Sequence, residues 1–276
     1  MTARWIWRSE GGPSPVNTFT WFRAVVTLDE VPVDSSLRFG ADSTAQLWLN
    51  GHAFRRKVTR FHEPRLRTEQ VDVTALLKVG SNIVTVLHHN WGPITTFQRT
   101  QNVHAGLYLE SSWLLSDESW RWRAAEEFGN EEAQFLGLAD AAPRIRFPLR
   151  WNARAAHDPR RDSTIAVEEE SGWAPVAVVE NGPWPSEPAV VETPAQRESD
   201  QRPLSILAAG RATRAIDPDE RSPSMLAASR LSPDSGMASD ADSLLDGQPV
   251  AIAGLGGETR YITVDFGPPM PGYPFF

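Results

Sequence analysis

The chain has 276 residues, with 27 basic and 35 acidic side chains, 11 tryptophans and no cysteine. The lack of cysteine excludes disulfides, a thiolate nucleophile, iron–sulfur clusters and cysteine-ligated zinc. A formal net charge of −8 argues against a nucleic-acid partner, because binding to phosphates relies on clustered positive charge. The sequence has no apolar run of membrane-spanning length and no signal-peptide core near its start, so we expect no membrane partner and a cytoplasmic location.

The tryptophans divide the chain into two parts, since all 11 lie between Trp5 and Trp184. We expect most of them to pack in a core that has no disulfides to support it. The composition predicts an N-terminal β-sandwich over residues 1–140, a wrapping segment with a proline-rich connector over 141–203, and a partial second β module with a mobile insertion over 204–276.

Short runs of aromatic and β-branched residues, bounded by turn residues, predict β-strands in chain order. The predicted strands are 19–28, 36–40, 45–49, 52–54, 70–73, 82–89, 106–110, 120–123, 204–207 and 261–266. Asn50-Gly51 follows one of these runs directly and predicts a hairpin, because both residues tolerate a positive φ. Many short strands without intervening helices indicate an all-β fold and an antiparallel β-sandwich.

Several motifs occur in a characteristic order along the chain. They are Trp5-Ile6-Trp7, Trp21-Phe22-Arg23, Leu37 to Asp42, Leu47 to Gly51, Val71 to Leu77 with Gly80 to Asn82, Asp117 to Arg121, Ser171 to Pro175, and Tyr261 to Gly267 with Gly272-Tyr273. In this order they resemble the N-terminal β-sandwich region of bacterial α-L-rhamnosidases, which are glycoside hydrolases. The resemblance implies a galactose-binding-like jelly roll, followed by a linker and an incomplete second β module.

The chain departs from this family where catalysis takes place. In these enzymes a large (α/α)₆ barrel carries the catalytic carboxylates, and the chain ends before any such barrel. The resemblance therefore implies no catalytic residue and a non-catalytic, truncated module that supports carbohydrate binding next to a missing catalytic domain. The alternatives are a freestanding carbohydrate-binding module, and a protein-interaction subunit that docks through its aromatic end, Tyr273 to Phe276, on a separately encoded barrel. The expected partners are a rhamnose-containing or related glycan and an (α/α)₆ domain in cis or in trans.

The segment from His88 to Trp91 carries the candidate carbohydrate-binding residues. It ends a strong predicted strand and begins a loop, where binding residues often lie. Trp91 can stack on a sugar ring, with His89 or Asn90 bonding to hydroxyls, and Trp48 beside the predicted hairpin is a further candidate. The alternative interpretation is a packed rim of the sandwich, in which these side chains serve the core.

No metal site or cofactor is indicated by the sequence. His88 and His89 are adjacent in a predicted strand, so they should point to opposite faces and cannot hold one metal ion together. A structural calcium ion is left open, with Asp42 and Asp72 as candidate ligands, but no ligand spacing singles them out.

Overall fold

The computed structural model describes residues 2–13, 15–57, 68–90, 104–129, 157, 172–180, 182, 184, 188–190, 201–212, 231–234, 236–237, 241–248, 250 and 259–267. The chain forms two compact units, Met1–Pro194 and Ala195–Phe276. Each unit is built on its own antiparallel sheet, so the expected all-β architecture is confirmed.

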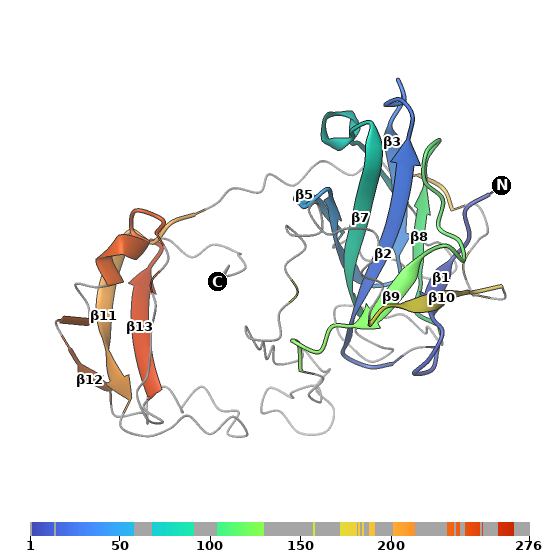
Figure 1. Ribbon diagram of the computed structural model, residues 1–276. Helices are drawn as coiled ribbons and strands as arrows, with labels where there is room; N and C mark the ends of the chain where they lie inside the picture. Colours follow the sequence, from blue (N-terminus) through green and yellow to red (C-terminus); the bar gives the residue numbers. More distant parts are fainter. Residues whose placement is uncertain are drawn as a thin grey trace. The chain divides into compact units, whose positions relative to one another are not determined.

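The first unit contains one sheet of ten strands (Figure 1). The strands are β1 (Ile6–Arg8), β2 (Thr18–Leu28), β3 (Ser36–Ala41), β4 (Thr44–Leu49), β5 (His52–Lys57), β6 (Glu69–Asp72), β7 (Gly80–Asn90), β8 (Leu107–Glu110), β9 (Arg121–Ala124) and β10 (Ala174–Val178), with the 3₁₀ helix η1 (Thr74–Leu76) before β7. Their order in the sheet is β5-β4-β7-β2-β9-β10-β1-β8-β3-β6. β10 therefore lies between β9 and β1, although it comes last in this part of the chain.

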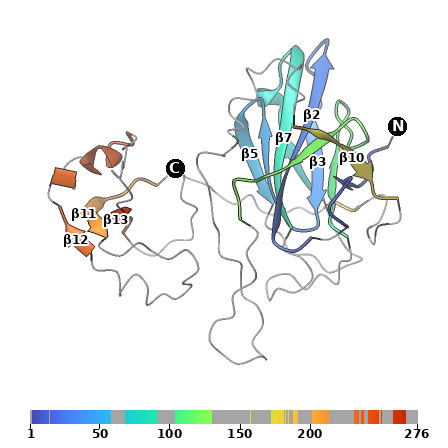
Figure 2. The same cartoon turned by 60° about the horizontal axis from the view of Figure 1, so that its bottom comes forward.

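The sheet curls so that its two halves face each other as the layers of a sandwich (Figures 1 and 2). Phe22 of β2 and Val84 of β7 pack in the same cluster as Phe39 of β3 and Leu107 of β8, and all four are fully buried. Alternate residues of each strand point into this core, as the period of two requires. Burial of one side chain of this size stabilises the fold by about 1.5–3 kcal/mol.

Most tryptophans lie in the interior, as expected. Seven of them are less than 10% exposed: Trp5, Trp7, Trp21, Trp113, Trp120, Trp122 and Trp184. Trp48 and Trp173 are partly buried, and Trp91 and Trp151 lie outside the described residues. The aromatic excess therefore serves packing at most of its described positions.

The predicted hairpin between β4 and β5 is present. Asn50 and Gly51 adopt positive φ angles of 51° and 82°, which suit the turn between twisted antiparallel strands. The Asn50 side chain also donates to the carbonyl oxygen of Leu76 and to Oδ1 of Asn82, both at 2.9 Å. This asparagine therefore joins the hairpin to the chain that leads into β7.

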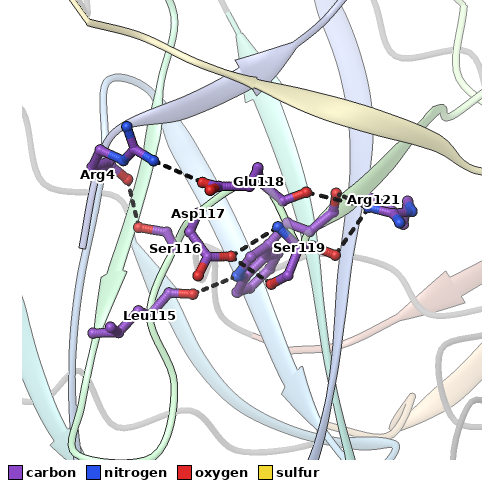
Figure 3. A network of polar contacts seen from close by, with 8 residues as sticks. Arg4, Leu115, Ser116, Asp117, Glu118, Ser119 and Arg121 are labelled. Carbon is purple, nitrogen blue, oxygen red and sulfur yellow. Dashed lines mark hydrogen bonds and ion pairs between the residues drawn. The ribbon is translucent and has the colours of Figure 1, made fainter. Parts of the chain in front are cut away.

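The Asp-x-Ser-Trp motif before β9 forms a turn held by its own side chains (Figure 3). Oδ1 of Asp117 accepts hydrogen bonds from the backbone N–H and the hydroxyl of Ser119. Trp120 follows this turn and lies in the core. It is fully buried, and its Nε1 donates to the carbonyl oxygen of Leu115 at 2.9 Å. The motif thus has a structural role at this position.

The same turn anchors the segment before β1 (Figure 3). The Ser116 hydroxyl donates to the carbonyl oxygen of Arg4 at 2.6 Å, and the Arg4 backbone N–H donates to the Ser116 carbonyl oxygen at 2.8 Å. An exposed ion pair joins Arg4 Nη2 to Glu118 Oε2 at 2.8 Å. These contacts hold the start of the chain beside β8.

The second unit contains a three-stranded sheet in the order β12-β11-β13, formed by β11 (Ser205–Ala212), β12 (Leu231–Pro233) and β13 (Thr259–Asp265), with the 3₁₀ helix η3 (Asp242–Leu244). The register between β11 and β13 shifts between Ile206 and Ala208. Gly210 of β11 pairs with β12, and a Cβ at this position would clash with the carbonyl oxygen of Ser232. The close approach of the two strands therefore requires glycine here. In the ranges that the structure describes, no helix has the length and apolar character to cross a membrane.

Candidate functional site

His89, one of the predicted binding residues, contacts neighbours within the protein. Its Nε2 lies 2.9 Å from Oδ1 of Asn17, and its ring stacks on Phe19 with centroids 3.8 Å apart. Burial, together with the nearby charge of His88, lowers the pKa of His89 to about 3. The imidazole is therefore neutral at physiological pH.

Asn90 is almost fully buried, with 1% of its surface exposed. Its Nδ2 donates to the carbonyl oxygen of Pro15 at 2.7 Å, and its Oδ1 accepts from the Ser43 hydroxyl at 3.3 Å. The side chain therefore ties the end of β7 to two other segments of the protein.

Trp48 and His89 lie on the outer face of the β4-β7-β2 layer, whereas Asn90 lies on the inner face. Trp48 is partly buried and its ring centroid is 5.4 Å from that of Trp21. Trp91 lies outside the described residues. The structure thus pairs Trp48 with Trp21 and His89 with Phe19, and it does not gather the described candidates around one surface. Sugar binding by these residues stays a prediction.

His88 and His89 point to opposite faces of β7, as expected. His88 is fully buried, and a hydrogen bond of 2.9 Å joins its Nε2 to Oδ1 of Asp42. The same Asp42 oxygen accepts from the backbone N–H of Gly106 at 2.9 Å, and Oδ2 accepts from the Ser43 hydroxyl at 3.1 Å. This buried carboxylate therefore joins β3, β7 and the start of β8.

Asp72, the second candidate calcium ligand, lies elsewhere. Its Oδ1 accepts from the hydroxyl of Thr74 at 2.6 Å and from the Thr74 backbone N–H at 2.9 Å. These two hydrogen bonds lower the pKa of the Asp72 carboxyl. Within the described parts of the chain, no three His, Asp or Glu side chains gather in a group that could hold a metal ion.

A pocket of about 810 Å³ lies on the side of the β10-β1-β8-β3 layer that faces away from the core. It is lined by the segment before β1, by residues of β3 and β8, and by the described residues 178–180, 182, 184 and 188. The last of these segments is held by a hydrogen bond from Val179 N–H to the Trp5 carbonyl oxygen at 2.8 Å. The volume falls within the range of small-molecule sites, roughly 300–1,000 Å³.

Three aromatic rings form one side of the pocket. The centroid of Trp5 lies 5.3 Å from that of Tyr108 and 4.6 Å from that of Trp184. All three are at most 6% exposed, so they form a small second core. Gly106 makes room for this arrangement, because a Cβ there would lie 2.6 Å from the Trp184 ring.

An ion pair between neighbouring strands forms the polar wall. Arg38 of β3 and Glu110 of β8 are directly paired in the sheet, and Arg38 Nη1 donates to Glu110 Oε2 at 2.7 Å. Arg38 Nη2 donates to the carbonyl oxygen of Pro188 at 2.6 Å, and the Tyr108 hydroxyl donates to the same Glu110 Oε2 at 3.0 Å. Both described hydrogen bonds to Glu110 use Oε2. Oε1 can therefore accept a hydrogen bond from a ligand.

Two further charged residues line the pocket. Arg4 is exposed and pairs with Glu118, and Glu180 is exposed just after β10. With Arg38 and Glu110 they give the described lining two positive and two negative side chains. A concave site with apolar rings and a few fixed polar groups is typical of small-ligand recognition.

The sequence reasoning missed this pocket. Its residues come from segments far apart in the chain, and nothing in their spacing brings them together. One local signal was available in β8, where Tyr108 and Glu110 alternate with the core residues Leu107 and Leu109. That alternation places two polar groups on the outer face of the strand.

No protein-family model and no curated protein matches this sequence. Among solved structures, a GH78 family rhamnosidase of Bacillus sp. GL1 matches 77% of this chain and 22% of its own, with 22% identity and a TM-score of 0.63. An α-L-rhamnosidase from Aspergillus terreus matches 75% of this chain and 24% of its own, with 15% identity and a TM-score of 0.53. The chain resembles α-L-rhamnosidases in its fold. The resemblance expected from the motifs is thus confirmed at the level of the fold, and the chain spans less than a quarter of the length of these two enzymes.

Proposed function

We propose that the chain is a non-catalytic module of the α-L-rhamnosidase type, which supports carbohydrate binding next to a catalytic (α/α)₆ domain. The observation that carries this proposal is the fold match to the Bacillus rhamnosidase, with a TM-score of 0.63 over 77% of this chain but only 22% of the enzyme. The match therefore leaves most of that enzyme outside the compared region. The glycan would be a rhamnose-containing or related saccharide.

The chemistry of the described pocket also supports a binding role. Glycosidases use two carboxyl groups across the scissile bond, one as acid and one as base or nucleophile. In the described lining, Glu110 is held by Arg38 and Tyr108, and Glu180 is exposed to solvent. A carboxylate fixed by two donors is suited to accept hydrogen bonds from a ligand.

Two measurements on the purified chain test this proposal. An aryl α-L-rhamnoside should not be hydrolysed faster than in buffer, and calorimetry or a glycan array should detect binding of at least one glycan. Hydrolysis above the buffer rate would contradict the non-catalytic role. A chain that binds no glycan would contradict the carbohydrate-binding role.

The pocket is formed by the first unit alone, which favours a freestanding carbohydrate-binding module as a second candidate. Glycan affinity that stays unchanged when a rhamnosidase barrel is added would support it. Glycan affinity that rises when the barrel is added would support the first proposal instead.

A docking role is a third candidate, favoured by the second unit. Leu204, Leu207 and Phe266 are 68%, 63% and 43% exposed, so these three apolar side chains are accessible to a partner. The aromatic end, Tyr273 to Phe276, lies outside the described residues. Co-purification with a separately expressed rhamnosidase barrel tests this role, and Leu207→Asp should then weaken the complex.

A further inference from the structure

We propose that the pocket beside Arg38, Glu110 and Trp184 is the glycan site of this module, and that it takes a neutral sugar ring by two adjacent hydroxyl groups. This inference rests on the proposed carbohydrate-binding function. It adds the place of binding and the chemical class of the ligand.

The first argument is the chemistry of the ion pair. A guanidinium group only donates hydrogen bonds and an ionised carboxylate only accepts them, whereas a sugar hydroxyl does both. Arg38 and Glu110 lie side by side on paired strands, with 30% and 28% of their side chains exposed. One hydroxyl oxygen can therefore accept from Arg38 while the neighbouring hydroxyl donates to Glu110 Oε1.

The second argument is that this pair is already held in place. Arg38 is fixed on one side by Glu110 and on the other by the carbonyl oxygen of Pro188. Glu110 is further fixed by the Tyr108 hydroxyl, whose ring packs against Trp5. Groups held in their bound geometry lose little conformational freedom when a ligand arrives, so more of the contact energy appears as affinity.

The third argument is an unused donor among the lining residues. The Nε1 of Trp184 is buried and has no hydrogen-bond partner among the described residues, and 6% of the residue is exposed. A buried N–H group without an acceptor is unfavourable, and most such groups in proteins are paired. A ligand hydroxyl or a water seated in the pocket would supply the missing acceptor.

The fourth argument is the balance of charge. The described lining carries Arg4 and Arg38 against Glu110 and Glu180, so it offers no net charge to an ionic ligand. The chain as a whole has a formal charge of −8, which repels anions further. Neutral glycosides are therefore favoured over uronic acids, which carry a carboxylate.

The test uses the full chain and a panel of methyl glycosides: rhamnoside, galactoside, mannoside, glucoside and glucuronide. We expect at least one neutral glycoside to bind by calorimetry and the glucuronide to bind about tenfold more weakly. Glu110→Gln and Arg38→Met should each weaken that binding by about tenfold or more, since each removes a charge-assisted hydrogen bond. Glu118→Gln, an exposed partner of Arg4 outside the pocket lining, is the matched control and should change binding less than about twofold.

A second readout does not depend on variants that disturb the pocket. In ¹H–¹⁵N spectra the indole signal of Trp184, assigned with Trp184→Phe, should shift on addition of the bound glycoside, while that of Trp120 should not. Tyr108→Phe keeps the ring and removes one donor, and it should weaken binding by a smaller factor than Glu110→Gln.

The outcomes separate the two levels of the proposal. Binding that is unchanged in Arg38→Met and Glu110→Gln, with no shift of the Trp184 signal, would overturn the pocket and leave the carbohydrate-binding function standing. Tighter binding of the glucuronide than of any neutral glycoside would overturn the ligand class. A chain that binds none of the panel, and no glycan on an array, would overturn both the pocket and the proposed function.

Discussion

The end of β7 and the pocket beside β8 both combine aromatic rings with polar side chains, but they use these groups differently. At the end of β7, Asn90 and His88 bond to other parts of the protein and are almost fully buried. In the pocket, Arg38 and Glu110 are partly exposed, and both described contacts to the Glu110 carboxylate use Oε2. The exposure of the polar side chains therefore distinguishes the two regions, whereas their composition does not.

The largest effect on stability is expected from Asp42→Ala, which tests whether the internal hydrogen bonds at the end of β7 stabilise the fold. Removal of this buried carboxylate takes away the acceptor of the Gly106 N–H and the hydrogen-bond partner of His88 Nε2. A buried polar group left without its hydrogen-bond partner costs about 1–3 kcal/mol of unfolding free energy, and this change leaves two such groups. Urea denaturation followed by tryptophan fluorescence measures it.

Asp72→Ala is the matched control for this change, because Asp72 is an exposed carboxylate that bonds only to Thr74 among its described contacts. Its effect on stability should be much smaller. Similar losses in the two variants would show that the Asp42 contacts do not stabilise the fold.

The second prediction concerns the pH dependence that follows from His89. The folded chain holds the pKa of His89 at about 3, whereas the unfolded chain returns it to its ordinary value of 6.5. Between these values the unfolded state binds more protons, so the free energy of unfolding falls as the pH falls. We expect a loss of roughly 2–4 kcal/mol from this group, since it keeps some contact with solvent.

His89→Phe is the comparison variant, because it keeps the stacking on Phe19 and cannot titrate. Denaturation curves at several pH values from 7 to 4 should show a smaller acid dependence in this variant than in the parent chain. Parallel curves would mean that His89 titrates normally in the folded state.

The third prediction tests the aromatic side of the pocket. Gly106→Ala places a Cβ within 2.6 Å of the Trp184 ring, so the ring or the strand must move. Overpacking of this kind costs about 1–3 kcal/mol. Thermal unfolding measures the loss, and Trp184→Phe in the same background should recover part of it because the smaller ring leaves room for the methyl group. A Gly106→Ala chain as stable as the parent would show that Trp184 does not pack here.

The smallest effect is expected at the turn before β9. Asp117→Ala removes both hydrogen bonds to Ser119 and should cost about 1 kcal/mol. Glu118→Ala removes only an exposed ion pair with Arg4, which is worth less than about 1 kcal/mol. Asp117→Ala should therefore unfold at a lower urea concentration than Glu118→Ala. The reverse order would contradict the structural role of the motif.

Features set by local chemistry could be predicted from the sequence. The turn at Asn50-Gly51 follows from the tolerance of both residues for positive φ. The opposite directions of His88 and His89 follow from the period of a strand. The burial of most tryptophans follows from their place in strand-like runs.

Features set by pairing between distant segments could not be predicted. β1 and β10 have three and five residues, too few to show a periodic pattern, and the sequence does not reveal that β10 inserts between β1 and β9. Arg38 and Glu110 meet because β3 pairs with β8, although their positions differ by 72 residues in the chain. The pocket depends on this pairing, which is why it was not predicted from the motifs.

The place of β10 in the sheet also bears on how the protein is made. Within the described strands, β10 is the hydrogen-bonded link between the half that ends at β9 and the half that begins at β1. While the ribosome is still translating the residues before Ala174, both of these strands present open edges, which can pair with other chains. The sheet of the first unit is completed only when this late segment emerges from the ribosome. Cells that slow or interrupt translation between β9 and β10 should therefore accumulate aggregates of the unfinished chain.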